Sequence, residues 1–465
     1  MRQGIMDLIY LNLYTTGIGA KYFTANATVA GTLITESNTE IGLYDLSVSG
    51  TTTVRNGSTL SKSGSGNLLF VGLVTVTNTV NTFIDFSVGN PSVELRGGIT
   101  CATNQASSNV KTGTGTWTFT TNNQSITPGN SASITFMGNV IISGNITVTA
   151  VNGLGVNGVF TQFNGSVNGT TSLSTLKNAG AIYLGAASPV VMTTGIFDYY
   201  YTGTTVGYVM NASYSIPLTS FYALVIGGTG TKTLTGNTTL STNLTLLASA
   251  ILDCSTFDLN IAGTSTISSG GKLSKTGAGN ILFTGLLSMT NGNIDFSGGN
   301  PTVEFRGGIS GGGTMSVSTG TGQWKFSTNN QVIINYPTSY NSPILISGAI
   351  TVTVSSVAIS TINNTLNGDN AASIFDNRGN INYTNATAPM VTGKLYCNQA
   401  ANKWSYYAAG NQDIRVPSDP IPGYYNLSLD TSGAKKLLGN VSVKGTYATS
   451  GTATLDSNGF SLTNP

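Results

Sequence analysis

Residues 89–98 read GNPSVELRGG, and residues 299–308 read GNPTVEFRGG. Both stretches keep a Gly-Asn-Pro corner, then a short alternating run in which a glutamate stands two residues before an arginine. A reaction centre normally occurs once in a chain, whereas a structural corner recurs wherever the architecture recurs. The duplication therefore indicates a repeated strand-and-corner unit.

The repetition extends through most of the chain. The other matched stretches are LSKSGSGNLLF at 60–70 with LSKTGAGNILF at 273–283, GTGTWTFTTNNQSI from 113 with GTGQWKFSTNNQVI from 320, and FYALVI at 221–226 with YYNLSL at 424–429. The offset between matched stretches falls from 213 residues (273 − 60) to 203 (424 − 221) along the chain, as expected for conserved strands joined by tolerant loops.

These matches predict the organisation of the chain. We expect an N-terminal attachment segment at 1–43, a first β-repeat unit at 44–221 and a second at 222–424. Residues 425–465 would begin a truncated third unit, because LDSNGFSL from 455 matches LDCSTFDL from 252.

Within a unit the pattern is strict alternation, as in TWTFT at 116–120, ITVT at 146–149 and TVTV at 351–354. Alternation places one side of a short strand in a core and the other in solvent, and Gly-Asn and Gly-Thr corners separate the runs. The sequence therefore predicts an all-β, elongated repetitive structure. A β-solenoid is favoured because Thr and Asn are abundant enough to form ladders along stacked coils; the alternative is a string of β-sandwich domains.

Composition excludes several classes of function. Of 465 residues only 8% are charged, the net charge is +2 and histidine is absent. The sequence has no basic stripe of the kind that binds nucleic acid, and it has no run of eighteen apolar residues that could span a membrane. The three cysteines are far apart and have no histidine to join them, so no metal or cofactor is expected. Hydroxyl and thiol nucleophiles also lack a histidine to activate them.

Two sets of acids could mark a polysaccharide depolymerase: Asp85 with Glu94, and Asp295 with Glu304. Such enzymes use a carboxylic acid and a second carboxylate. Because Glu and Arg two residues apart on a strand point to the same face, we favour structural pairs, with no catalytic residue. These pairs are Glu94 with Arg96 and Glu304 with Arg306.

Aromatic residues mark the place where the two copies differ. Aromatic side chains in divergent, loop-like segments can stack on sugar rings or cover a partner surface, and otherwise pack in a core or against neighbouring chains. The candidate ligand-binding residues are Tyr199, Tyr200, Tyr201, Trp404, Tyr406 and Tyr407.

Phrases such as YYNLSL, TLTGNTTLSTNLTL (233–246), GAKKLLGNVSV (433–443) and LDSNGFSLTNP (455–465) resemble the β-strand repeats of phage fibre proteins and bacterial surface adhesins. The resemblance covers most of residues 44–465. It implies a fibrous, extracellular or virion-borne role and carries over no catalytic residue.

We therefore expect a non-enzymatic structural or adhesive protein at the surface of a phage virion, acting as a fibre or surface decoration. It would associate with itself or with other virion or surface proteins, and its aromatic loops would contact a host surface glycan. The alternatives are a cell-surface adhesin or extracellular filament subunit, and a polysaccharide depolymerase built on a β-solenoid.

Overall fold

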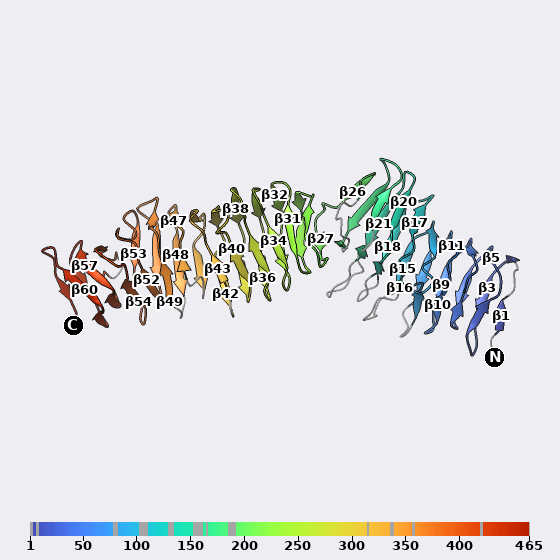
Figure 1. Cartoon of the computed structure of the whole chain (residues 1–465), viewed down its shortest axis with the longest axis horizontal. Helices are drawn as coiled ribbons and strands as arrows, with labels where there is room; N and C mark the ends of the chain where they lie inside the picture. Colours follow the sequence, from blue (N-terminus) through green and yellow to red (C-terminus); the bar gives the residue numbers. More distant parts are fainter. Residues whose placement is uncertain are drawn as a thin grey trace. The chain divides into compact units, whose positions relative to one another are not determined.

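The computed structural model describes residues 3–5, 9–77, 82–101, 110–128, 134–151, 161–163, 166–184, 192–313, 316–334, 339–355, 359–418 and 422–464. These residues form strands and no helix, and the strands stack in parallel as a β-solenoid of about 18 turns (Figure 1). The expected all-β solenoid is thus confirmed, and tandem sandwiches are not what the chain forms. The chain divides into two compact units. Unit 1 comprises residues 1–210 with 221–225, and unit 2 comprises residues 211–220 with 226–465.

Unit 1 contains three parallel sheets, and successive strands of the chain visit them in turn. The first sheet holds β1 (Gln3–Ile5), β4 (Lys21–Phe23), β7 (Thr39–Glu40), β10 (Thr59–Ser61), β13 (Phe83–Asp85), β16 (Val110–Lys111), β19 (Ile134–Phe136), β22 (Thr161–Phe163), β25 (Ala181–Leu184) and β27 (Thr205–Tyr208). The second holds β2 (Ile9–Tyr10), β5 (Ala27–Val29), β8 (Leu46–Val48), β11 (Asn67–Phe70), β14 (Ser92–Leu95), β17 (Trp117–Thr120), β20 (Val140–Ser143) and β23 (Val167–Gly169). The third holds β3 (Leu13–Thr15), β6 (Leu33–Thr35), β9 (Thr52–Val54), β12 (Val74–Val76), β15 (Ile99–Cys101), β18 (Gln124–Thr127), β21 (Thr147–Val151), β24 (Thr175–Ala179) and β26 (Ile196–Asp198).

Unit 2 repeats this plan. Its first sheet holds β28 (Tyr214–Ile216), β31 (Thr231–Leu234), β34 (Ile251–Asp253), β37 (Lys272–Ser274), β40 (Asn293–Asp295) and β43 (Ser316–Ser318). The second holds β32 (Thr238–Leu240), β35 (Leu259–Ile261), β38 (Asn280–Phe283), β41 (Thr302–Phe305), β44 (Trp324–Ser327), β47 (Ile344–Ser347) and β50 (Leu366–Gly368). The third holds β33 (Leu244–Leu246), β36 (Ser265–Ser268), β39 (Leu287–Thr290), β42 (Ile309–Gly312), β45 (Gln331–Ile334), β48 (Thr351–Ser355), β51 (Ile374–Asn377) and β53 (Lys394–Tyr396). The later sheets hold β46 (Ser339–Tyr340), β49 (Ile359–Ile362), β52 (Asn380–Tyr383), β54 (Lys403–Tyr406), β56 (Asn426–Leu429) and β59 (Tyr447–Thr449); β55 (Gln412–Ile414), β57 (Ser432–Leu437) and β60 (Thr452–Asp456); and β58 (Val441–Ser442) with β61 (Leu462–Thr463). The remaining strands are β29 (Ser220–Phe221) and β30 (Ala223–Ile226).

Register between coils follows the alternation of the sequence. Leu68 pairs with Val93, Val93 with Trp117, and Trp117 with Val140, and each of these side chains is buried. The intervening residues of the same strands face outward and are partly exposed. A one-residue slip would turn every apolar side chain to solvent, so the buried rows fix the register.

The sequence repeat is also a structural repeat. The copies of the opening stretch form β14 and β41, each paired on both sides by the strands of the neighbouring coils. In both corners the asparagine, Asn90 or Asn300, has a φ of 47°. A Cβ on Gly89 would lie 2.4 Å from the Gly64 oxygen, and one on Gly299 would lie 2.1 Å from the Gly277 oxygen, so only glycine fits where successive corners touch.

Asparagine side chains connect the coils at their turns, as the expected ladders require. In each case the Oδ1 atom accepts a backbone N–H from the next coil at 2.6 to 3.0 Å. The residues are Asn12, Asn26, Asn38, Asn90, Asn123, Asn168, Asn211, Asn237, Asn243, Asn300, Asn330, Asn367, Asn411, Asn426 and Asn440.

Residues 9–43, predicted to be an attachment segment, fold as coils of the same stack. Strand β5 pairs with β8, and β6 pairs with β9. Attachment and the predicted unit boundaries remain predictions.

Candidate functional site

The glutamates of the duplicated stretch form ion pairs with the arginine two residues later, just past the end of each strand. Arg96 Nε donates to Glu94 Oε1 at 2.7 Å, and Arg306 Nε donates to Glu304 Oε1 at 2.8 Å. The next coil adds a hydroxyl donor in each copy: Thr120 at 2.7 Å from Glu94 and Ser327 at 2.6 Å from Glu304. Each glutamate therefore ties one coil to the next.

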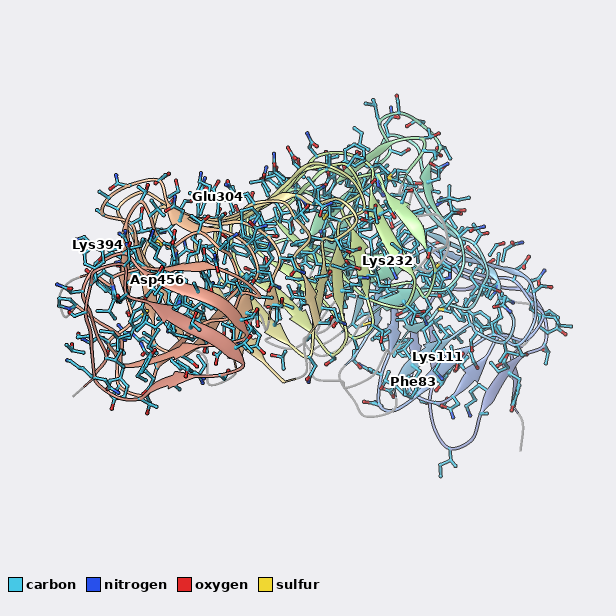
Figure 2. The ribbon with its side chains drawn as sticks, turned by 60° about the vertical axis from the view of Figure 1, so that its left-hand side comes forward. Phe83, Lys111, Lys232, Glu304, Lys394 and Asp456 are labelled. Atoms are coloured by element: carbon cyan, nitrogen blue, oxygen red, sulfur yellow. The ribbon has the colours of Figure 1, made fainter. Side chains whose placement is uncertain are left out.

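The aspartates are also paired, but by different coils in the two copies. Asp85 accepts from Lys111 of the following coil at 3.0 Å, and Figure 2 shows this lysine beside Phe83. Asp295 instead accepts from Lys272 of the preceding coil at 2.7 Å. The charge on the aspartate is balanced in both copies although its partner changes sides. A reaction centre would need a fixed arrangement of its groups, whereas charge neutralisation does not.

These interactions lower the pKa values of all four carboxyls. Burial raises the pKa of Glu94, but hydrogen bonds from Thr120 and Arg96 outweigh it and hold the pKa below 4.5. Burial likewise opposes hydrogen bonds from Ser87 and Lys111 at Asp85, and the pKa falls below 3.8. At Glu304, burial raises the pKa, but hydrogen bonds from Ser327 and Arg306 outweigh it and lower the pKa. At Asp295, hydrogen bonds from Lys272 and Ser297 likewise outweigh burial and lower the pKa. A general acid for glycosidic cleavage needs a raised pKa, so the carboxyls are poorly suited to that role.

The first aromatic cluster extends from the end of β26. Phe197 and Tyr199 stack with ring centroids 5.1 Å apart, and the Lys177 ammonium lies 4.7 Å from the centroid of the Tyr201 ring. The Tyr201 hydroxyl donates to Asp198, and this bond raises the pKa of Tyr201. Tyr200 is 48% exposed and Tyr201 38% exposed. We call Tyr199, Tyr200 and Tyr201 the tyrosine patch.

The second aromatic group lies elsewhere in its coil. Trp404 and Tyr406 belong to β54 and are completely buried, because this strand is paired on one side with β52 and on the other with β56. Tyr406 shares a 2.8 Å hydrogen bond with the Tyr424 hydroxyl inside the core. A ligand in solvent does not reach Trp404 or Tyr406, and only Tyr407, 43% exposed, remains accessible.

Buried lysines are a feature that the sequence analysis missed. Lys275 Nζ donates to the Ser255 and Phe257 oxygens at 3.1 and 2.6 Å, and Lys62 occupies the equivalent place in the first copy. Burial lowers the pKa of both lysines, although nearby acids oppose this. Burial also lowers the pKa of Lys232 to about 8. The signal was the repeated Leu-Ser-Lys, which places a lysine at the same corner twice.

The described residues bring together no group of three or more His, Cys, Asp or Glu side chains able to hold a metal ion. Cys101, Cys254 and Cys397 are buried and free. The described part of the chain contains no apolar helix of membrane-spanning length. Comparison with known proteins finds no matching family model, no matching curated protein and no matching solved structure.

Proposed function

We propose that the chain is a non-enzymatic structural and adhesive fibre protein, in which the coils are scaffold and the tyrosine patch contacts a surface. The observation that carries the proposal is the balance of charge around the duplicated acids. All four carboxylates are held by cations or hydroxyls, and Asp85 and Asp295 take their lysines from opposite sides. These groups behave as connections between coils.

The tyrosine patch supports the adhesive part of the proposal. It presents partly exposed rings at a position where the two copies differ in sequence, so the stacking of coils does not require it. Aromatic faces provide large contact area, and sugar rings stack on them through their apolar faces. The glycan-binding role, the virion surface as the location and self-association are predictions from the sequence. A bacterial surface adhesin or filament subunit would have the same scaffold and the same patch.

Binding to an array of purified bacterial surface polysaccharides tests the proposal. We expect the full chain to bind at least one of them and the double variant Tyr200→Ala/Tyr201→Ala to bind about tenfold more weakly. Tyr14→Ala is the matched control, because Tyr14 is an exposed tyrosine of another coil, 57% exposed, and its loss should leave binding unchanged. Unaltered binding by the double variant, or no binding to any polysaccharide, would remove the adhesive role from the patch.

A further inference from the structure

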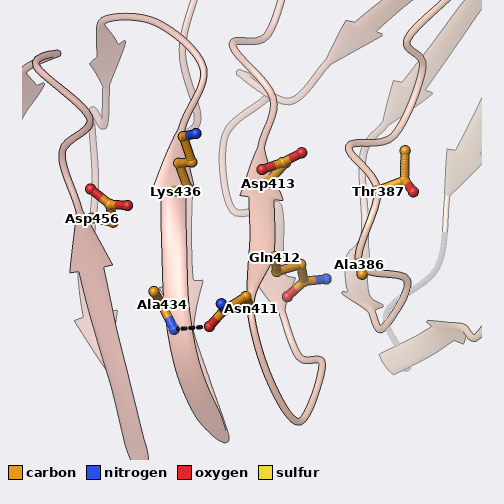
Figure 3. Close-up of a pocket in the computed structure, with 8 residues that line it drawn as sticks. All are labelled: Ala386, Thr387, Asn411, Gln412, Asp413, Ala434, Lys436 and Asp456. Carbon is orange, nitrogen blue, oxygen red and sulfur yellow. Dashed lines mark hydrogen bonds between the residues drawn. The ribbon is translucent and has the colours of Figure 1, made fainter.

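A hollow of about 400 Å³ lies in unit 2 over three neighbouring parallel strands, β55, β57 and β60 (Figure 3). Asp413, Lys436 and Asp456 line it, one from each strand. Asp413 is the register partner of Lys436, and Lys436 is the register partner of Asp456. The hollow therefore presents a carboxylate, an ammonium and a second carboxylate in a row, about 4.8 Å apart along the stack. We call these three residues the charged ladder.

The charged ladder is unpaired within the part of the chain that the structure describes. None of its members forms an ion pair, in contrast to Asp85, Glu94, Asp295 and Glu304. Asp456 accepts one local bond, from the Asn458 N–H at 3.0 Å. The other acceptor positions of the Asp456 carboxylate are therefore open toward the hollow.

The repeat shows that coil stacking does not need these charges. The equivalent strands of the preceding copy are β28, β31 and β34, where Ser215, Thr233 and Asp253 stand in the same register. Asp253 is used inside the stack, since it accepts from the Thr276 hydroxyl at 2.8 Å. Two of the three charges therefore occur only in the later copy.

We propose that the hollow binds a neutral oligosaccharide; the inference rests on the proposed surface-binding function and assigns it a second contact site. Sugar hydroxyls both donate and accept, so they satisfy carboxylates and an ammonium in turn. A polyanion would face two carboxylates, and a polycation would face Lys436 between them, so the alternating row matches neither kind of chain along its whole length.

The rim of the hollow extends the same chemistry. Asn411 uses its Oδ1 to accept the Ala434 N–H at 2.9 Å, which leaves its amide N–H groups as donors. The Thr387 hydroxyl at the opposite side both donates and accepts. The strand spacing is close to the length of one pyranose ring, so consecutive sugars of an extended chain can meet consecutive strands.

Titration calorimetry and saturation-transfer NMR on the full chain test the proposal, with cellohexaose and maltohexaose as neutral probes. A galacturonate hexamer and a glucosamine hexamer are the charged comparators. The decisive variant is Asp413→Ser/Lys436→Thr, which installs the residues found in the equivalent strands and so preserves the coil. The tyrosine-patch variant, Tyr200→Ala/Tyr201→Ala, is measured in parallel.

We expect a neutral hexasaccharide to bind more tightly than either charged hexamer, and Asp413→Ser/Lys436→Thr to weaken it at least tenfold at an unchanged melting temperature. The tyrosine-patch variant should bind this probe like the wild type, so the two sites can fail separately. Three results would overturn the inference: no neutral probe bound at millimolar concentration, tighter binding of a charged hexamer, or full affinity in the ladder variant.

Discussion

Replacing Gln331 with leucine tests whether polar side chains inside the stack join successive coils. Gln331 is 3% exposed, and its Oε1 accepts the Gly308 N–H at 3.1 Å. Its Nε2 donates to the Phe305 and Ser327 oxygens at 2.8 and 2.9 Å. Leucine has a similar volume and removes all three bonds.

The expected cost follows from these contacts. A buried N–H left without an acceptor costs roughly 1–3 kcal/mol, and each weakened carbonyl bond adds about 0.5–1.5 kcal/mol. The Ser327 oxygen keeps the Asn329 N–H at 2.9 Å, and leucine returns some apolar burial. The net loss in the free energy of local opening is about 3 kcal/mol, which corresponds to roughly 100-fold faster hydrogen exchange at the Gly308 amide.

Hydrogen exchange followed by mass spectrometry measures this loss in the full chain without assuming two-state unfolding. Gln323→Leu is the matched control, because Gln323 directly precedes β44, the strand before that of Gln331, and is only partly buried. The equivalent change Gln124→Leu should expose the Gly98 amide in the same way, since Gln124 accepts that N–H at 3.0 Å. If Gly308 in Gln331→Leu exchanged within about threefold of the control, the reasoning would be refuted.

Three further changes test the packing and charge interactions. Phe305→Ala removes a buried ring stacked 5.4 Å from Phe283 and 5.2 Å from Phe326, and should lower stability in denaturant by about 3–5 kcal/mol; a loss below about 1 kcal/mol would contradict it. Lys275→Met removes the lysine donor from the Phe257 oxygen and leaves the Ser255 oxygen with the Gly277 N–H alone, so it should lower the melting temperature, whereas the exposed Lys403→Met should not. The lowered pKa of Glu304 contributes stability that is fully present above pH 4.5 and is lost as the pH falls through the folded pKa. The melting-temperature difference between wild type and Glu304→Gln should therefore shrink as the pH is lowered below 4.5; a constant difference would argue against this interaction.

The strands and their inward faces could be predicted from the sequence, because alternation such as Thr116–Thr120 specifies one buried face wherever it occurs. The sequence favours parallel stacking of coils over β-sandwich domains but does not decide between the two folds. Sandwich and solenoid share the same alternation, and they differ in which strand lies beside which. Only the register, such as Leu68 beside Val93, separates the two folds.

The candidate sites were predictable to the extent that they depend on neighbours in the chain. Glu94 and Arg96 share a face because they are two residues apart, but the Thr120 hydroxyl comes from the next coil and needed the register. Lys275 was overlooked because lysine is rarely buried without a partner, and its partners here are backbone oxygens. The difference between the two copies predicts a loop at Trp404, whereas its spacing of two residues from Tyr406 is that of the strand that the structure shows.

The most direct test of the central claim is to incubate the purified chain with bacterial surface polysaccharides and to measure both binding and reducing ends over time. We predict that the chain stays bound while the length of the polysaccharide does not change. Release of oligosaccharides that stops in Glu94→Gln or Glu304→Gln would contradict it, because these carboxylates would then be catalytic groups and not connections between coils.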